Sequence, residues 1–220
     1  MIKAILFDFD GTLANTTQGI IKTMAATFTR MSLPIPSAED MAATIGLPLK
    51  TSLQTLGHLN EEDAEKATAI YRELFPVFEV ENVTLFPDTL STLEALREKG
   101  LRMAVVTSRD TPSLHLIMSP RGMLPFFEAK VTGSDGLLAK PAPDMVLSLL
   151  SSMSLRPEEA LVVGDTTYDI IMGQRANCPT CAVTYGNHSC EILSQHNPTY
   201  IIHSLHDILK VGELASAHTE

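Results

Sequence analysis

Short apolar runs separated by helix-forming segments dominate the chain from residue 84 onward. Runs with the length of buried strands lie at 4–7, 101–106, 129–132, 160–163 and 180–183, with a weaker candidate at 200–202. Between them, Asp88 is placed to cap a helix that carries Leu93 and Leu96 and ends at Gly100, and Asp144 is placed to cap another. Strands that alternate with helices predict βαβ units and a mostly parallel sheet.

Residues 16–83 lack this alternation and contain no convincing strand. Ile20, Met24 and Phe28 follow helical spacing, and a second helix is predicted from Glu61 to Phe75, with Asn60 as its N-cap. We therefore predict an α/β fold, a Rossmann-like doubly wound parallel sheet built from residues 1–15 and 84–220. Residues 16–83 are expected to form an inserted α-helical cap domain.

The composition is that of a globular protein with a sizeable core. Of 220 residues, 45% are hydrophobic and 19% are charged, and the net charge is −10 with a pI near 5.1. This acidic balance disfavours a nucleic-acid partner. The apolar run at the N-terminus is too short for a signal peptide, and no stretch approaches the roughly 20 apolar residues that cross a bilayer. We expect a cytoplasmic protein without a membrane partner, a monomer or a homodimer.

Polar clusters follow the predicted strands at their carboxyl ends, which is where ligands bind in a doubly wound parallel sheet. The clusters are Asp8-Phe9-Asp10-Gly11-Thr12 after the first strand, Thr107-Ser108-Arg109 after the second, and Gly164-Asp165 with Asp169 after the strand at 160–163. Lys140 lies in a loop that opens a helix. These clusters are remote in sequence, and we expect them to converge on one rim of the sheet.

The acidic residues of these clusters suit phosphoryl transfer assisted by a divalent cation. Asp8, Asp165 and Asp169 offer hard oxygen ligands for octahedral Mg²⁺, and three like charges cost free energy when they meet unless a cation binds. One carboxylate then remains to attack phosphorus in line. Asp10 is placed to protonate the leaving oxygen and later to act as the base for a water molecule.

Phosphate recognition is expected from Thr107 and Lys140, which offer a hydroxyl and an ammonium group to phosphoryl oxygens. Two other loop types are excluded. A calcium loop starting at Asp8 needs glycine at its sixth position and glutamate at its twelfth, where the chain has Leu13 and Gly19. A Walker phosphate loop needs Gly-x-x-x-x-Gly-Lys, which the sequence lacks.

These motifs resemble those of the haloacid dehalogenase-like hydrolases in order and spacing, and the resemblance extends over the whole chain. The motifs are Asp8-x-Asp10-Gly11-Thr12-Leu13 after an apolar strand, then Thr107, Lys140 and Gly164-Asp165-x-x-x-Asp169. The most similar subgroup has a helical cap and includes phosphoglycolate phosphatases and β-phosphoglucomutases.

The resemblance implies a role for each matching residue. Asp8 would form an aspartyl-phosphate, and Asp10 would be the acid and base. Phosphate would bind to Thr107, Ser108 and Lys140. Mg²⁺ would sit on Asp8, the Asp10 carbonyl and Asp165, with Asp169 nearby. Cap residues would select a small phosphorylated metabolite, and Lys50, in a loop at 46–50, is the candidate for a specificity contact. Ser108-Arg109 departs from the Asn or Gly that many relatives have after Thr107, and we expect Arg109 either to contact phosphate or substrate or to form an exposed salt bridge.

Three other functions are alternatives to an Mg²⁺-dependent phosphatase. A dehalogenase releases halide, which needs no proton, so it has no use for Asp10. A non-enzymatic protein would be expected to have lost at least one of Asp8, Asp10, Lys140 or Asp165. A sugar phosphomutase stays open, because the residues of the core cannot separate it from a phosphatase.

Cys178-Pro179-Thr180-Cys181 suggests a redox or zinc site, with His188 and Cys190 downstream. A redox pair of this kind lies at a helix N-terminus, whereas this pair follows a helix and leads into a strand. The spacing to His188 and Cys190 is irregular for zinc. We interpret the cysteines as reduced residues, with the pair packing at the start of a strand.

Overall fold

A computed structural model describes residues 1–78, 80–212 and 214. Its main sheet has six parallel strands in the order β5-β4-β1-β6-β7-β8. These strands are β1 (Ala4–Phe7), β4 (Arg102–Val106), β5 (Ala129–Val131), β6 (Ala160–Gly164), β7 (Thr180–Val183) and β8 (Tyr200–Ile202). The strands predicted from the apolar runs are confirmed, with ends that shift by no more than one residue.

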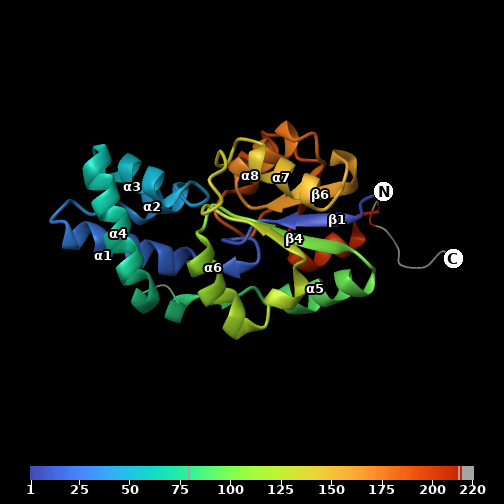
Figure 1. The fold of residues 1–220 in the computed structure, drawn as a ribbon, viewed down its shortest axis with the longest axis horizontal. Coiled ribbons are helices and arrows are strands. Elements are labelled where there is room, and N and C mark those ends of the chain that lie inside the picture. The colour runs from blue at the N-terminus through green and yellow to red at the C-terminus, as the bar shows by residue number, and fades with distance from the viewer. Residues whose placement is uncertain (79, 213, 215–220) are drawn as a thin grey trace.

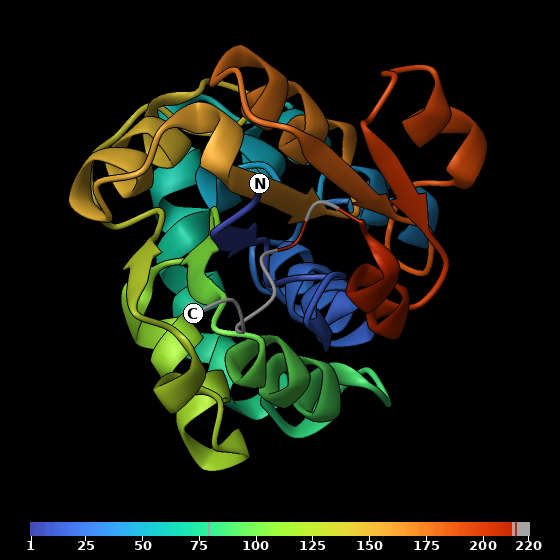
Figure 2. The same cartoon turned by 90° about the vertical axis from the view of Figure 1, so that its right-hand side faces the viewer.

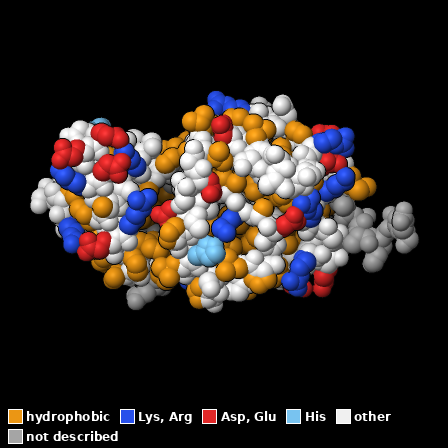
Figure 3. Space-filling view, in the orientation of Figure 1, with side chains coloured by type: hydrophobic (Ala, Val, Ile, Leu, Met, Phe, Trp, Pro, Cys, Tyr) orange, Lys and Arg blue, Asp and Glu red, His pale blue; other side chains and the backbone are white. Residues whose placement is uncertain are grey.

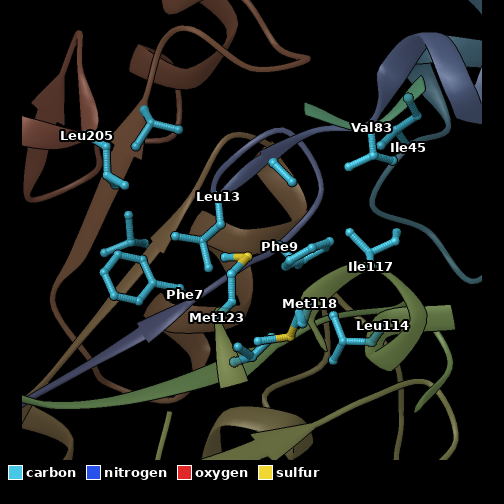
Figure 4. Packing of buried hydrophobic residues seen from close by; sticks show 14 of the residues in the cluster. Phe7, Phe9, Leu13, Ile45, Val83, Leu114, Ile117, Met118, Met123 and Leu205 are labelled. Atoms are coloured by element: carbon cyan, nitrogen blue, oxygen red, sulfur yellow. The ribbon is translucent and has the colours of Figure 1, made fainter. Parts of the chain in front are cut away.

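Alternate residues of β1 serve the two faces of the sheet. Ile5 and Phe7 belong to the hydrophobic cluster that contains Leu93, while Leu6 belongs to the cluster that contains Val146. Helices α5 (Thr89–Glu98) and α6 (Thr111–Met118) supply the first cluster, and α7 (Asp144–Ser152) and α8 (Thr167–Arg175) supply the second. Figures 1 and 2 show helices on both faces, and Figure 4 shows the core around Phe7. The doubly wound α/β fold is therefore confirmed.

The predicted C-terminal residue of one helix is confirmed, whereas the two predicted N-caps differ in detail from the structure. Gly100 has φ +76° and follows α5, as expected for a left-handed C-terminal residue. Asp88 occupies the N-cap position of α5, but its side chain makes no capping hydrogen bond. The N-cap of α7 is Pro143, and Asp144 is the first residue of the helix. There its negative charge still complements the helix dipole.

Four helices lie beyond the carboxyl ends of the strands (Figure 1). They are α1 (Thr17–Arg30), α2 (Ala38–Ala43), α3 (Leu49–Gly57) and α4 (Glu61–Phe78). Asn60 caps α4, since its Oδ1 accepts from the Asp63 N–H at 2.9 Å. The helix runs past the predicted end at Phe75 and contains Pro76. We call α1–α4 the helical lobe.

A short antiparallel ribbon stands where the chain enters and leaves the helical lobe. Strand β2 (Ala14–Asn15) pairs with β3 (Thr84–Leu85). Two-residue strands carry no recognisable hydrophobic pattern, so the sequence did not indicate the ribbon. The remaining short helices are η1 (Val80–Asn82), η2 (Ser119–Arg121), η3 (Leu124–Phe126), η4 (Pro157–Glu159), α9 (Cys190–Ser194) and η5 (Leu205–Lys210). Within the described residues, no helix combines the length and hydrophobicity that crossing a membrane requires.

Candidate active site

The ends of three neighbouring strands place polar side chains on the rim that faces the helical lobe. Asp8 follows β1, and its N–H donates to the carbonyl of Val163 at 2.8 Å. Thr107 follows β4, and its N–H donates to the carbonyl of Val131 at 3.0 Å. Asp165 follows β6 directly. Because the first two residues continue the hydrogen bonding of the sheet, the sheet fixes the positions of their backbones.

Three carboxylates gather at this rim. Asp8, Asp165 and Asp169 are buried, and each offers an oxygen within 4.8 Å of the others. Burial raises the pKa of Asp8 well above its usual range, together with the charges of Asp169 and Asp165 and in spite of the Lys140 ammonium. Burial and the neighbouring Asp169 carboxylate also raise the pKa of Asp165 to about 7. The cluster thus has the oxygen ligands and the charge for a hard divalent cation.

Lys140 joins two of these acids. Its Nζ lies 2.5 Å from Oδ1 of Asp8 and 2.6 Å from Oδ1 of Asp169, and its side chain is fully buried. Burial opposes its charge, but the carboxylates of Asp169 and Asp8 outweigh that effect and raise the pKa of Lys140. The lysine therefore carries a positive charge beside Asp8, from a loop far away in the sequence.

The orientation of Asp165 depends on residues that sequence reasoning did not assign. Thr12 donates to its Oδ1 at 3.1 Å, and Asn187 donates to its Oδ2 from the backbone at 2.7 Å and from the side chain at 2.8 Å. Gly11, with φ +81°, leaves room for this carboxylate, since a Cβ there would lie 2.2 Å from Asp165 Oδ2. The signal for Asn187 was its place just after β7, at the same edge of the sheet.

Asp169 also organises the start of α8. Its Oδ2 accepts from the N–H of Thr166 at 3.1 Å and from the Thr166 hydroxyl at 2.6 Å, which forms a capping box. Its other oxygen accepts from Lys140. Both oxygens of Asp169 are thus engaged with the protein itself, which favours a supporting place beside a cation rather than a direct one.

Asp10 forms a two-point ion pair with Arg109. The Nη2 and Nε of Arg109 donate to the two carboxylate oxygens of Asp10 at 2.5 and 3.1 Å. The guanidinium carbon of Arg109 lies 5.5 Å from the ring centre of Phe75 in α4. The expected exposed salt bridge of Arg109 is wrong, because the side chain is 7% exposed and lies inside the site. The sequence placed Arg109 after β4, but it gave no sign of Phe75.

Ser108 connects the rim to the helical lobe. Its hydroxyl donates to the carbonyl of Gly46 at 2.7 Å, in the loop before α3. The hydroxyl of Thr107 accepts from the N–H of Arg109 at 3.1 Å and is buried. The predicted phosphate ligands Thr107 and Ser108 line the same cavity as Asp8 and Asp10, and Lys140 contacts Asp8, although the Ser108 hydroxyl is engaged by the lobe.

Lys50 lies farther out, in the first turn of α3. Its ammonium pairs with Glu61 and with Glu65, the latter at 2.5 Å. Lys50 lines a cavity of about 1000 Å³ that also includes Asp8, Asp10 and Arg109. The structure thus brings the predicted residues of the core together, and Lys50 lines the same cavity from the helical lobe.

The cysteines lie apart from this rim. Cys178 and Cys181 are buried, and Cys190 is exposed. Burial raises the pKa of both buried thiols to about 12. Among the described residues, the group of side chains suited to a metal ion is Asp8, Asp165 and Asp169, and it contains no cysteine.

Comparison with known proteins identifies the family to which the chain belongs. The family model described as haloacid dehalogenase-like hydrolase matches residues 5–183. The chain is 33% identical to a protein named pyrophosphatase PpaX from Oceanobacillus iheyensis, over 96% of either chain. It is 30% identical to one named phosphoglycolate phosphatase from Escherichia coli, over 100% of this chain and 95% of the relative.

A solved structure from Bacteroides fragilis, described as a haloacid dehalogenase-like hydrolase, shares the fold. It superposes with a TM-score of 0.90 at 25% identity, over 94% of this chain and 100% of that one. The extent of these matches, together with the acids and the lysine at the strand ends, establishes that this chain belongs to the haloacid dehalogenase-like hydrolase family.

Proposed function

We propose that the protein is an Mg²⁺-dependent phosphatase that hydrolyses a small phosphate monoester through an aspartyl-phosphate on Asp8. The observation that carries this proposal is the buried Asp8 carboxylate held at 2.5 Å by the Lys140 ammonium. That pair offers a nucleophile and a cation for phosphoryl oxygens in one place. The similarity to relatives named as a pyrophosphatase and a phosphoglycolate phosphatase supports phosphate chemistry.

In the first step, a carboxylate oxygen of Asp8 attacks phosphorus and the bond from phosphorus to the ester oxygen breaks. Asp10 gives its proton to the departing oxygen, so that an alcohol rather than an alkoxide leaves. Asp10 accepts two hydrogen bonds from Arg109, at 2.5 and 3.1 Å. It gives up one of them to contact the leaving oxygen. Thr107 and Lys140 contact the phosphoryl oxygens.

In the second step, Asp10 takes a proton from a water molecule, and the water oxygen attacks phosphorus. The bond between phosphorus and Asp8 breaks, which releases inorganic phosphate and restores the carboxylate. Asp10 thereby regains the proton that it gave away, so the cycle balances.

The carboxylate cluster fits Mg²⁺, because three buried acids converge within 4.8 Å and two of them have raised pKa values. Asp8, the Asp10 carbonyl and Asp165 would hold the ion, with Asp169 beside it through Lys140. When bound, the ion supplies positive charge that offsets the phosphate and the acids.

Residues 16–83 are proposed to act as a cap domain over a core made of residues 1–15 and 84–220. The contact of Ser108 with Gly46 and that of Arg109 with Phe75 join the helical lobe to the catalytic rim. The lobe then excludes water during transfer and contacts the leaving group.

Replacing Asp8 with asparagine tests the proposal. With p-nitrophenyl phosphate and Mg²⁺, D8N should lose at least about 10³-fold in kcat, because the amide cannot attack phosphorus. The matched control is Asp88→Asn, since Asp88 is exposed and its side chain makes no capping bond. Equal turnover by D8N and D88N would refute the assigned nucleophile.

The alternative of a sugar phosphomutase needs a separate readout. Incubation with hexose 1-phosphates should release inorganic phosphate without forming the 6-phosphate isomer. If the isomer forms faster than phosphate is released, the protein is a mutase and not a hydrolase.

A further inference from the structure

The cavity of about 1000 Å³ extends well beyond the proposed phosphoryl site. It runs from Asp8 and Asp10 at the strand ends to the side chains of α1, α4 and the loop at 45–48. Ligand pockets of proteins span roughly 300 to 1000 Å³. The space is therefore large for a phosphoryl group alone, and it suits a leaving group with a body of its own.

Part of the cavity side formed by the helical lobe is apolar, beside polar and charged lining residues of the lobe, which are Thr44, Lys50, Ser52, Glu65, Thr68 and Arg72. We call the apolar part the apolar wall and define it by Ile20, Met24, Ile45, Leu47, Tyr71 and Phe75. Met24 and Ile45 are buried within the hydrophobic cluster that continues into the core. A charged group placed against such a wall loses hydration without gaining a partner, whereas an apolar group gains free energy there.

The basic side chains that line the cavity already contact acids of the protein. Among the described lining residues they are Lys50, Arg72 and Arg109. Their partners are Glu65 at 2.5 Å for Lys50, Asp110 at 3.3 Å for Arg72 and Asp10 at 2.5 Å for Arg109. Figure 3 likewise shows acidic and basic side chains intermixed over the outer face of the helical lobe. A second anionic group on the substrate would have to displace Glu61 and Glu65 from Lys50 or Asp110 from Arg72, or compete with the leaving oxygen and Asp10 beside Arg109.

We infer that the substrate is a phosphate monoester of a neutral alcohol with an apolar, ring-sized body that packs against the apolar wall. The inference rests on the proposed phosphatase function and names its substrate class. It sets this chain apart from a pyrophosphatase and a phosphoglycolate phosphatase, because pyrophosphate and phosphoglycolate both carry a second anionic group. Specificity then comes from burial of apolar surface rather than from a second cationic site.

A series of substrates with the same phosphoryl group tests the inference. We would measure kcat/KM with Mg²⁺ for benzyl phosphate, ethyl phosphate, 2-phosphoglycolate and pyrophosphate. Benzyl phosphate should exceed ethyl phosphate by roughly tenfold or more, because its ring buries apolar surface. It should exceed both anionic substrates as well. A preference for phosphoglycolate or pyrophosphate over benzyl phosphate would overturn the inference but leave the phosphatase intact. Failure to hydrolyse any of them, p-nitrophenyl phosphate included, would refute the phosphatase itself.

A lysine placed in the apolar wall gives a second, independent test. Leu47 is half-buried in the wall, so L47K should raise the ratio of phosphoglycolate to benzyl phosphate turnover by roughly tenfold. The matched control is L90K, because Leu90 is 41% exposed on α5 and does not line the cavity. An L47K ratio equal to that of L90K would show that the leaving group does not reach the wall. Should L47K not fold, the ranking of substrates by the unaltered protein still decides.

Discussion

The ammonium of Lys140 lies 2.5 Å from Oδ1 of Asp8, and both side chains are buried. Removing the lysine leaves Asp8 and Asp169 without their shared cation. We expect Lys140→Ala to lower the free energy of unfolding by about 3 kcal/mol in chelator-treated buffer, because an uncompensated buried charge is costly. Urea denaturation at pH 7 measures this. Lys99→Ala, at an exposed site, should change it by less than about 0.5 kcal/mol. Equal effects would mean that Asp8 and Asp169 do not need the lysine.

Gly11 and Gly122 share a left-handed backbone but differ in their surroundings. Their φ angles are +81° and +66°, and a Cβ would meet Asp165 Oδ2 at 2.2 Å at the first and nothing within 4 Å at the second. Both alanine variants should lose about 1 kcal/mol through backbone strain. Only Gly11→Ala should also lose roughly 100-fold or more in phosphatase activity, because Asp165 must move. A loss of activity in Gly122→Ala of the same size would contradict this reading.

Mg²⁺ should stabilise the folded protein through the three-carboxylate cluster. A ligand that binds only the folded state adds about 2.7 kcal/mol at a hundred times its Kd. We therefore expect the melting temperature to rise on titration with Mg²⁺ and to return when a chelator is added. Asp165→Asn should remove most of the rise, and Asp135→Asn, at an exposed position, should keep it. A full rise in Asp165→Asn would place the ion elsewhere.

Glu159 should make stability depend on pH in the acid range. Hydrogen bonds from Arg156 and Lys3 lower its pKa from 4.5 to about 2. The folded state therefore favours the charged form, so this contribution is complete above pH 4.5 and is lost as the pH falls toward 2. The gap in unfolding free energy between the native chain and Glu159→Gln should be largest at pH 7 and shrink below pH 4.5. For Glu98→Gln, at an exposed site, the gap should stay near zero throughout. A gap that grows on acidification would reverse the assigned sign.

The meeting of Asp8, Thr107 and Asp165 could be predicted because it follows from a general rule. Parallel strands end at one edge of the sheet, so residues that follow them are brought together whatever the lengths of the connections. The strands themselves were recognisable as buried apolar runs. Lys140 was expected at the same rim, but its loop has no periodic pattern, so its contacts with Asp8 and Asp169 could not be predicted.

The pairing of Asp10 with Arg109 could not be predicted in the same way. Both residues were expected near the rim, but which acid a long guanidinium side chain reaches depends on its rotamer and on what covers it. The cover is Phe75, which belongs to α4 in the helical lobe, and the sequence pattern of α4 does not show which residue of the core it meets. Asn187 was missed for a related reason, because its contact with Asp165 arises from the path of a loop.

The ribbon of β2 and β3 has a consequence for how such a protein can diversify. Ala14 pairs with Leu85 and Asn15 with Thr84. The segment that enters the helical lobe and the segment that leaves it therefore run side by side. An insertion with a different length or a different number of helices can begin and end at this ribbon, while the six parallel strands keep their order. One helical insertion can then be exchanged for another during evolution, while the residues at the strand ends are retained.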